Sequence, residues 1–308
     1  MPDLLVVSVL RSVRAWAVMS FVLALVCASS ALCAAEDRYD ERNLIPFRQY
    51  QIVTYVYRPE KEAATFPIVI FSHGRATTAE ARGRVDQPAR SIIDFWLKRG
   101  FAVVAAVRPG YGATGGGDRE VSGSRWVEGP DRTLICEGRG DFQAVAEKSA
   151  EAVSKVIEWT RAQPWADRSR ILLLGQSVGG LTTVALTSKQ IEGVVGAINF
   201  SGGTGGEPVR SPGMSCKPEA IAALYRAYGA KASVPSLWLY SRNDQFWGEA
   251  APRDWYAAFS EGGSDTRFFQ APALPNRDGH QLLLHGANYW MPEVDAFLRK
   301  LGVMRTDP

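Results

Sequence analysis

Residues 170–186 have the sequence RILLLGQSVGGLTTVAL. The apolar run at its start is typical of a buried strand, and the proline-free segment at its end is typical of a helix. A serine at the sharp turn between such a strand and helix forms a nucleophile elbow. Gly175 and Gly179 occupy the positions where the two backbones approach, which require small residues. We therefore expect Ser177 to be exposed at the carboxyl edge of a sheet, and the N–H of Val178 to stabilise an oxyanion there.

The alternative to this catalytic interpretation is an ordinary glycine-rich turn, because a bare G-x-S-x-G pattern also occurs by chance. A nucleophile elbow requires an apolar strand before the motif and a helix after it, and both patterns are present. This context favours the catalytic interpretation.

The composition is that of an ordinary globular protein, because the 308 residues are 46% hydrophobic and 22% charged. This length suffices for one large domain or two small ones. The net charge of +3 is too small to indicate nucleic-acid binding. The chain also lacks a block of Lys and Arg with interleaved aromatic residues, so we expect no nucleic-acid partner.

Residues 1–35 differ in kind from the rest of the chain. Two arginines precede an apolar run over residues 15–28, small residues follow as far as Ala35, and charges begin at Glu36. This pattern predicts a secretory signal peptide over residues 1–35 and a secreted or periplasmic protein. The alternative is an uncleaved membrane anchor, but the apolar run is short for a span of about 20 residues. We expect a single domain over residues 36–308, with no stable membrane span after the signal is removed.

Two cysteines remain once Cys27 and Cys33 are assigned to the signal peptide. In an oxidising compartment Cys136 and Cys216 are able to form one disulfide, and two separate buried thiols are the alternative. The three histidines and these two cysteines match no metal-ligand spacing, so we expect no metal site.

Short apolar runs alternate with helical patterns from residue 67 onward. Strand-like runs lie at residues 50–57, 67–71, 101–107, 193–200, 235–240 and 266–270. Helical patterns lie at residues 91–99, 142–162, 221–228 and 254–261. Fully apolar strands that alternate with helices predict an α/β fold, with a mostly parallel sheet covered by helices on both faces.

Other segments are less regular. Residues 38–47 are polar and predict a surface arm, and the glycine-rich segment 108–117 predicts an exposed loop. Residues 118–140 show no clean period, and residues 204–220 are rich in glycine and proline and predict a loop. We expect the last helix to begin at Pro292, because the fixed φ of proline suits a first helical turn.

A serine nucleophile needs a base, and the base needs an acid to orient it. His73 precedes Ser177, whereas a nucleophile elbow requires the order serine, acid, histidine, so we interpret His73 as structural. His280 and His285 both follow the last predicted strand. We prefer His280 because it lies in an Asp-Gly-His turn that is able to bring the imidazole over Ser177. His285 follows three leucines and remains the alternative.

The acid is expected after the strand at residues 235–240. Asp244 follows this strand and would accept the Nδ1–H of His280, although capping of a turn is an alternative role. Asp254 lies at a predicted helix start, where N-capping explains it. Asp278 is too near His280 in the sequence for an easy alignment.

A second oxyanion donor is expected from the loop at residues 73–76, where the N–H of Arg75 is the candidate. Tyr111, Trp126 and Trp247 lie in loops expected at the same rim and are candidates for lining a substrate pocket. Simple packing is the alternative role for these three aromatic residues.

Five segments together resemble the α/β-hydrolase superfamily. They are Phe71-Ser72-His73-Gly74, Arg108-Pro109-Gly110-Tyr111-Gly112, Gly175-Gln176-Ser177-Val178-Gly179-Gly180, Asn243-Asp244 and Asp278-Gly279-His280. Within the superfamily the chain looks most like dienelactone hydrolase-like and prolyl oligopeptidase-like serine hydrolases, over residues 45–303. The resemblance implies an eight-stranded sheet, no cofactor, and hydrolysis through an acyl-enzyme on Ser177. Dienelactone hydrolases proper use a cysteine nucleophile, whereas this chain has a serine.

These observations predict a serine hydrolase that cleaves carboxylic esters and uses Ser177, His280 and Asp244. A small peptidase or amidase with the same three residues is one alternative. A hydrolase fold that binds a ligand without catalysis is the other. The expected partner is therefore a small-molecule ester or amide.

Overall fold

The computed structural model describes residues 39–60 and 63–304. The predicted signal peptide, with Cys27 and Cys33, lies outside the described residues. The described residues from Asp40 onward belong to one structural unit.

An eight-stranded sheet lies at the centre of this unit, with the strand order β1-β2-β4-β3-β7-β8-β11-β12. Its strands are β1 (Glu41–Phe47), β2 (Tyr50–Tyr57), β3 (Phe66–Ser72), β4 (Ala102–Ala106), β7 (Ala166–Gln176), β8 (Val194–Phe200), β11 (Ser236–Ser241) and β12 (Thr266–Ala271). The pairs β1–β2 and β2–β4 are antiparallel, and all other neighbouring strands in this sheet are parallel. The predicted mostly parallel, eight-stranded sheet is confirmed.

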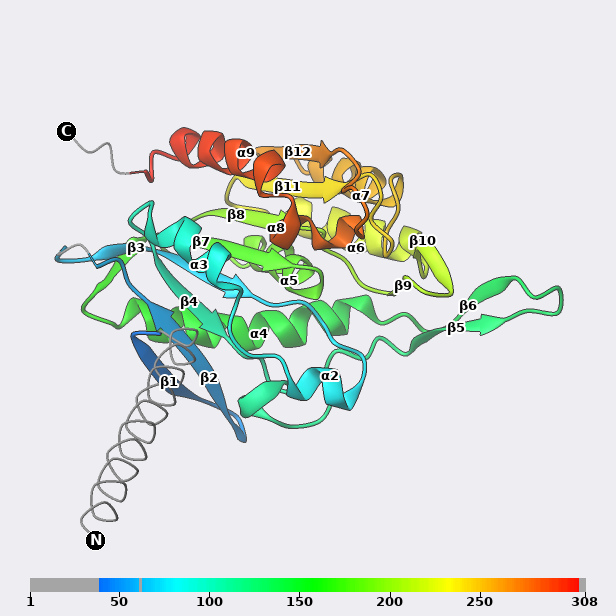
Figure 1. Cartoon of the computed structure of the whole chain (residues 1–308), viewed down its shortest axis with the longest axis horizontal. Helices are drawn as coiled ribbons and strands as arrows, with labels where there is room; N and C mark the ends of the chain where they lie inside the picture. The colour runs from blue at the N-terminus through cyan, green and yellow to red at the C-terminus, as the bar shows by residue number, and fades with distance from the viewer. Residues whose placement is uncertain (1–38, 61–62, 305–308) are drawn as a thin grey trace, which may run out of the picture. The chain divides into compact units, whose positions relative to one another are not determined.

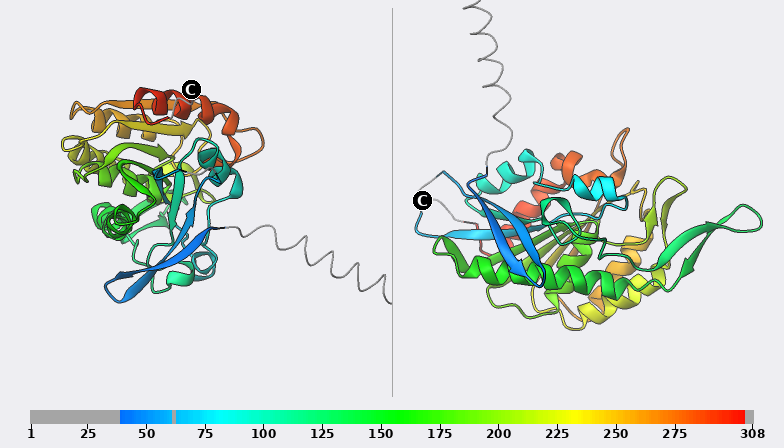
Figure 2. Two further views of the ribbon diagram at one scale, coloured as in Figure 1. Left: turned by 90° about the vertical axis from the view of Figure 1, so that its left-hand side faces the viewer. Right: turned by 90° about the horizontal axis from the view of Figure 1, so that it is seen from below.

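Helices cover both faces of the sheet (Figures 1 and 2). The helices are α2 (Ala79–Gly83), α3 (Arg90–Leu97), α4 (Phe142–Arg161), α5 (Val178–Thr187), α6 (Pro218–Gly229), α7 (Ala251–Ser260), α8 (Leu282–His285) and α9 (Ala287–Lys300), with short 3₁₀ turns η1 (Gly112–Thr114) and η2 (Gly279–Gln281). Helix α3 contacts α8, and α8 contacts α9. Helices α4, α5 and α6 pack together in a separate group (Figure 2). Strands β3 and β4, and β7 from Ile171 to Gly175, are buried on both faces, which explains their continuous apolar runs.

The predicted surface arm at residues 38–47 is wrong over most of its length. Residues 41–47 form β1, which pairs with β2 from Glu41 opposite Val56 to Phe47 opposite Tyr50. Only Ile45 and Phe47 of this edge strand are buried. Its other side chains are partly or fully exposed, and this mixed exposure makes the segment look polar in the sequence.

Two antiparallel hairpins occupy segments predicted to be irregular. They are β5 (Ser124–Glu128) with β6 (Leu134–Gly138), and β9 (Gly206–Glu207) with β10 (Ser211–Ser215). The first extends beyond the carboxyl ends of β11 and β12 (Figure 1). A disulfide joins Cys136 in this hairpin to Cys216 after the other, with a Cα–Cα distance of 5.4 Å. The two hairpins are therefore covalently linked.

The last helix begins five residues before the predicted start, because α9 runs from Ala287 and contains Pro292. In the turn before the proline, Trp290 packs on Phe95 of α3, with ring centroids 4.7 Å apart. In the part of the chain that the structure describes, no helix is both long and apolar enough to cross a membrane.

Candidate active site

Ser177 lies at the turn from β7 into α5, with the backbone angles φ 59° and ψ −124°. A non-glycine residue in this region of φ is strained, and the surroundings must hold it there. Its N–H donates to Phe200 O over 3.0 Å, and its carbonyl accepts from Leu181 and Gly203. Ser177 is only 8% exposed. It is therefore buried, whereas an exposed serine was predicted.

The glycines of the motif are required by close backbone contacts. A Cβ on Gly175 would lie 2.0 Å from Gly179 O, and a Cβ on Gly179 would lie 2.0 Å from Ser72 O. A Cβ on Gly180 would lie 2.3 Å from the Asn199 side-chain oxygen. The helix thus starts in direct contact with both its own strand and the end of β3, as the sequence pattern predicts.

The structure brings Asp244 and His280 together. Asp244 follows β11, and His280 lies in η2 on the loop after β12. The Nδ1 of His280 lies 3.0 Å from Asp244 Oδ2 and 3.2 Å from Oδ1, and both side chains are buried. The Asp244 carboxylate also accepts the N–H groups of Phe246 and Trp247, at 2.8 and 3.1 Å. These bonds fix the orientation of the carboxylate toward the imidazole.

The loop that carries His280 is tied to the neighbouring segments. Gln176, directly before the elbow serine, donates from Nε2 to His280 O over 3.2 Å. The carboxylate of Asp278 accepts from both Gln245 N and His280 N, at 2.9 and 2.8 Å. A Cβ on Gly279 would lie 2.6 Å from the Asp244 N, so the two turns pack in direct contact. Asp278 therefore holds the turns together and does not contact the imidazole ring as an acid would.

The other candidates lie elsewhere. His285 is exposed at the end of α8, with its Nε2 3.5 Å from Arg277. Asp254 is the fourth residue of α7, whose N-cap is Ala250, so the predicted N-capping role for Asp254 is wrong. Neither side chain takes part in the contact between Asp244 and His280.

Two aromatic rings contact the imidazole of His280. Phe246 stacks on it, with ring centroids 4.0 Å apart and an interplanar angle of 30°. Trp247 approaches edge-on at 5.4 Å, and its indole N–H donates to Ser201 O. Trp247 was predicted to line a pocket, but it is buried against the imidazole. Phe246 was not predicted, although the aromatic pair directly after the candidate acid is a signal that points to it.

His73 is held as a neutral imidazole. Its Nδ1 donates to Gly74 O over 2.7 Å, and its Nε2 accepts the N–H of Arg108 over 3.1 Å. Burial, and secondarily the charge of Arg108, lowers the pKa of His73 to about 3. Because Nε2 is already an acceptor for a backbone N–H, this ring is not free to take a proton from Ser177.

The loop after β3 lies beside the nucleophile. A Cβ on Gly74 would lie 3.3 Å from the Cβ of Ser177, so the peptide between Gly74 and Arg75 is next to the elbow. The Arg75 side chain pairs with Asp118 over 2.6 Å. Val178 is the first residue of α5, and the N–H groups of a first helical turn have no partner inside the helix. The two predicted oxyanion donors therefore belong to segments that flank Ser177.

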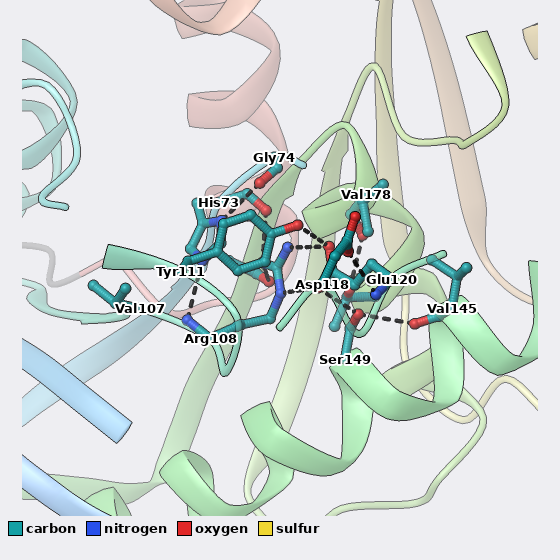
Figure 3. A network of polar contacts seen from close by, with 12 residues as sticks. His73, Gly74, Val107, Arg108, Tyr111, Asp118, Glu120, Val145, Ser149 and Val178 are labelled. Carbon is teal, nitrogen blue, oxygen red and sulfur yellow. Dashed lines mark hydrogen bonds and ion pairs between the residues drawn. The ribbon is translucent and has the colours of Figure 1, made fainter. Parts of the chain in front are cut away.

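Tyr111 does not line an exposed rim as predicted. It is 1% exposed, and its hydroxyl donates to Glu120 over 2.6 Å (Figure 3). Arg108 is equally buried, so the prediction of an exposed loop over residues 108–117 is wrong at its start. The physical reason is that Glu120 neutralises Arg108, and sequence patterns do not reveal this pairing.

Trp126 attaches the β5–β6 hairpin to the loop after β8. Its indole N–H donates to Gly205 O over 3.1 Å, and it lies opposite Cys136 in the hairpin. Gly205 O also accepts the N–H of Cys216. The indole is therefore part of the anchor of the hairpin, next to the disulfide.

Within residues 39–60 and 63–304, no group of three or more His, Cys, Asp or Glu side chains is placed to hold a metal ion.

Several solved structures have a similar fold. Esterase Pf2001 of Pyrococcus furiosus is 15% identical, with a TM-score of 0.58 over 85% of this chain and 92% of that chain. Est1E from Butyrivibrio proteoclasticus, bound to ferulic acid, is 16% identical, with a TM-score of 0.57 over 84% of this chain and 98% of that chain. The acylaminoacyl peptidase of Pyrococcus horikoshii is 13% identical, with a TM-score of 0.57 over 91% of this chain and 44% of that chain. The chain thus spans less than half the length of that peptidase.

Comparison with curated protein sequences gives no match. Residues 50–239, more than half of the chain, match the family described as X-Pro dipeptidyl-peptidase (S15 family). This segment includes the elbow and the oxyanion loop, and the structural similarities confirm the predicted resemblance to α/β-hydrolases. The chain belongs to the X-Pro dipeptidyl-peptidase (S15) family and is a serine hydrolase with the α/β-hydrolase fold.

Proposed function

We propose that the protein hydrolyses carboxylic esters through an acyl-enzyme on Ser177, with His280 as the base and Asp244 as its orienting acid. The observation that carries this proposal is the 3.0 Å contact between His280 Nδ1 and Asp244 Oδ2. Since Nδ1 faces the carboxylate, Nε2 is the nitrogen left to accept the serine proton. The strained elbow at Ser177 provides the nucleophile.

The reaction proceeds in two halves. Ser177 Oγ attacks the ester carbonyl while its proton moves to His280 Nε2, and Asp244 stabilises the imidazolium. The N–H groups of Val178 and Arg75 bind the oxyanion, and loss of one such donor typically costs about 3–4 kcal/mol of transition-state stabilisation. The tetrahedral intermediate then collapses, and the imidazolium protonates the departing alcohol. Water attacks the acyl-enzyme by the same route and regenerates Ser177.

A peptidase is the second candidate. The family match supports it, because that family is named for removing X-Pro dipeptides. The same three side chains serve amide hydrolysis, where protonation of the leaving amine by His280 becomes more important. The two candidates are separated by comparing p-nitrophenyl butyrate with alanyl-prolyl-p-nitroanilide. Turnover of the ester without the anilide favours the esterase, and efficient cleavage of the anilide would replace our proposal with the peptidase.

The mechanism is tested by mass spectrometry after treatment with a fluorophosphonate, together with kinetics of single variants. We expect one adduct, on Ser177, and a loss of turnover of about 10³-fold or more in Ser177→Ala and His280→Ala. His285→Ala is the matched control and should retain its activity. Normal turnover in His280→Ala would refute the proposed base. A folded protein without an adduct would favour a non-catalytic binding protein.

We also propose that residues 1–35 are a secretory signal and that the mature protein is secreted or periplasmic. The disulfide between Cys136 and Cys216 supports this proposal, because such bonds persist in oxidising compartments. The mass of the protein recovered from its native compartment tests it. A mature N-terminus near Glu36 is expected, and an intact N-terminus on a cytoplasmic protein would contradict it.

A further inference from the structure

A buried ion pair lies next to the loop that follows β3 (Figure 3). Arg108 follows β4, and Glu120 comes twelve residues later in the chain. The Nε and Nη2 of Arg108 donate to the two carboxylate oxygens of Glu120 at 2.7 and 3.1 Å. The side chains are 1% and 2% exposed. A buried ion pair often stabilises the fold no more than apolar residues of the same size would. The groups that this pair positions are therefore of more interest than its contribution to stability.

Glu120 is held from several sides. Its Oε2 accepts the Tyr111 hydroxyl at 2.6 Å, and its Oε1 accepts the Ser149 hydroxyl from α4 at 2.9 Å. The Ser149 hydroxyl shares its proton with Val145 O, which lies at 2.8 Å. With the two bonds from Arg108, both carboxylate oxygens are satisfied. The carboxylate therefore fixes the guanidinium in one orientation.

The remaining donors of Arg108 face the loop at residues 72–74. Its Nη1 donates to Ser72 Oγ at 3.0 Å and to His73 O at 2.6 Å. Its backbone N–H donates to His73 Nε2 at 3.1 Å, and this bond forces the ring proton onto Nδ1. Tyr111 packs edge-on against the same imidazole, with ring centroids 4.6 Å apart. Arg108 thus holds both the backbone and the side chain of His73.

The imidazole of His73 in turn holds the peptide group between Gly74 and Arg75. Its Nδ1–H donates to Gly74 O at 2.7 Å. A trans peptide is planar, and its C=O and N–H point in opposite directions. Fixing the carbonyl of Gly74 therefore fixes the direction of the N–H of Arg75. The same loop lies against the elbow, since a Cβ on Gly179 would be 2.5 Å from His73 O.

We propose that the Arg108–Glu120 ion pair positions the oxyanion-binding N–H of Arg75, acting through His73 and the carbonyl of Gly74. The inference rests on the proposed function, because the N–H of Arg75 binds an oxyanion only if Ser177 is the nucleophile. Arg108, Glu120 and His73 are positioning residues, because they act on the transition state through the peptide and do not touch substrate.

The test is Glu120→Gln, which keeps the size of the side chain and removes its charge. We expect kcat for a p-nitrophenyl ester to fall about 10- to 100-fold while KM stays within about twofold, because a small misplacement affects mainly the transition state. A trifluoromethyl ketone, which forms an oxyanion adduct on the serine, should lose affinity by the same factor. Asp295→Asn is the matched control: it breaks the pair between Arg99, which follows α3, and Asp295 of α9, and should leave kcat unchanged.

A folded Glu120→Gln protein with normal kcat would overturn the inference, as would a loss of kcat without a loss of ketone affinity. If this variant does not fold, the same kinetics are measured on Tyr111→Phe. This substitution removes one hydrogen bond to Glu120 and keeps the aromatic ring against His73. A fall in kcat of about threefold or more at constant KM is then expected, and no change overturns the inference. Fluorophosphonate labelling of the unaltered chain separates the two proposals. An unlabelled Ser177 overturns both, whereas a labelled Ser177 with an unaffected Glu120→Gln overturns only this one.

Discussion

The buried His73 makes a quantitative prediction about stability and pH. Its pKa is about 3 in the folded protein because of burial and the nearby Arg108, against an ordinary value of 6.5. Between these two values the unfolded chain binds a proton that the folded chain does not, so stability falls as the pH is lowered. Each pH unit in this window is worth about 1.4 kcal/mol, so the loss from about pH 7 to about pH 4.5 is roughly 2.5 kcal/mol.

The assay is urea unfolding at these two pH values, for the unaltered chain and for His73→Asn. Asparagine keeps an N–H able to donate near the position of Nδ1 and does not titrate. Although burial opposes it, the Arg108 guanidinium lowers the pKa of Glu120 below its ordinary value of 4.5, so the stability from this carboxylate is lost mainly below about pH 4.5. The difference between the two proteins therefore isolates His73. If both lost the same free energy of unfolding between the two pH values, the imidazole would not be buried and neutral, and the reasoning would be refuted.

Three further predictions concern the elbow, the imidazole and the disulfide. Gly179→Ala should lower the free energy of unfolding by about 1–3 kcal/mol, since its Cβ would meet a carbonyl oxygen at 2.0 Å; an unchanged urea midpoint would contradict this. Phe246→Leu should lower kcat about fivefold, because a ring stacked 4.0 Å from His280 stabilises the imidazolium by about 1 kcal/mol; unchanged kcat on a folded variant would contradict it. Replacing Cys136 and Cys216 by serine opens a loop with a sequence separation of 80 and should cost about 2–4 kcal/mol in urea unfolding, whereas an equal midpoint would show that the hairpin is held without the bond.

Much of the sheet could be predicted from local patterns. Strands β3 and β4, and β7 from Ile171 onward, are covered on both faces, so each appears as a continuous apolar run. The edge strand β1 was missed because only Ile45 and Phe47 are buried in it. The β5–β6 hairpin was missed for a related reason, since no residue in either of its strands is fully buried. Strands with little burial leave no clear period in the sequence.

The candidate site was only partly predictable. The sequence contains Asp244, His280 and His285 in suitable order, but the preference for His280 rested on the turn that carries it. The structure places Asp244 against His280 and leaves His285 exposed. The role of Asp278 follows from contacts between turns that lie far apart in the chain, and such contacts have no local signature. Phe246 was not predicted either, although it lies in an aromatic pair directly after Asp244.

By itself, the sequence determined the nucleophile elbow, the α/β class and the order of the candidate catalytic residues. These features depend on local requirements: apolar runs for buried strands, and glycines where backbones touch next to Ser177. Only the tertiary structure decided that Arg108 and Glu120 form one buried pair, that Tyr111 is enclosed with them, and that the hairpin is linked at Cys136. The physical reason is that a buried charge is stable only beside a partner, and folding alone determines which partner comes within reach.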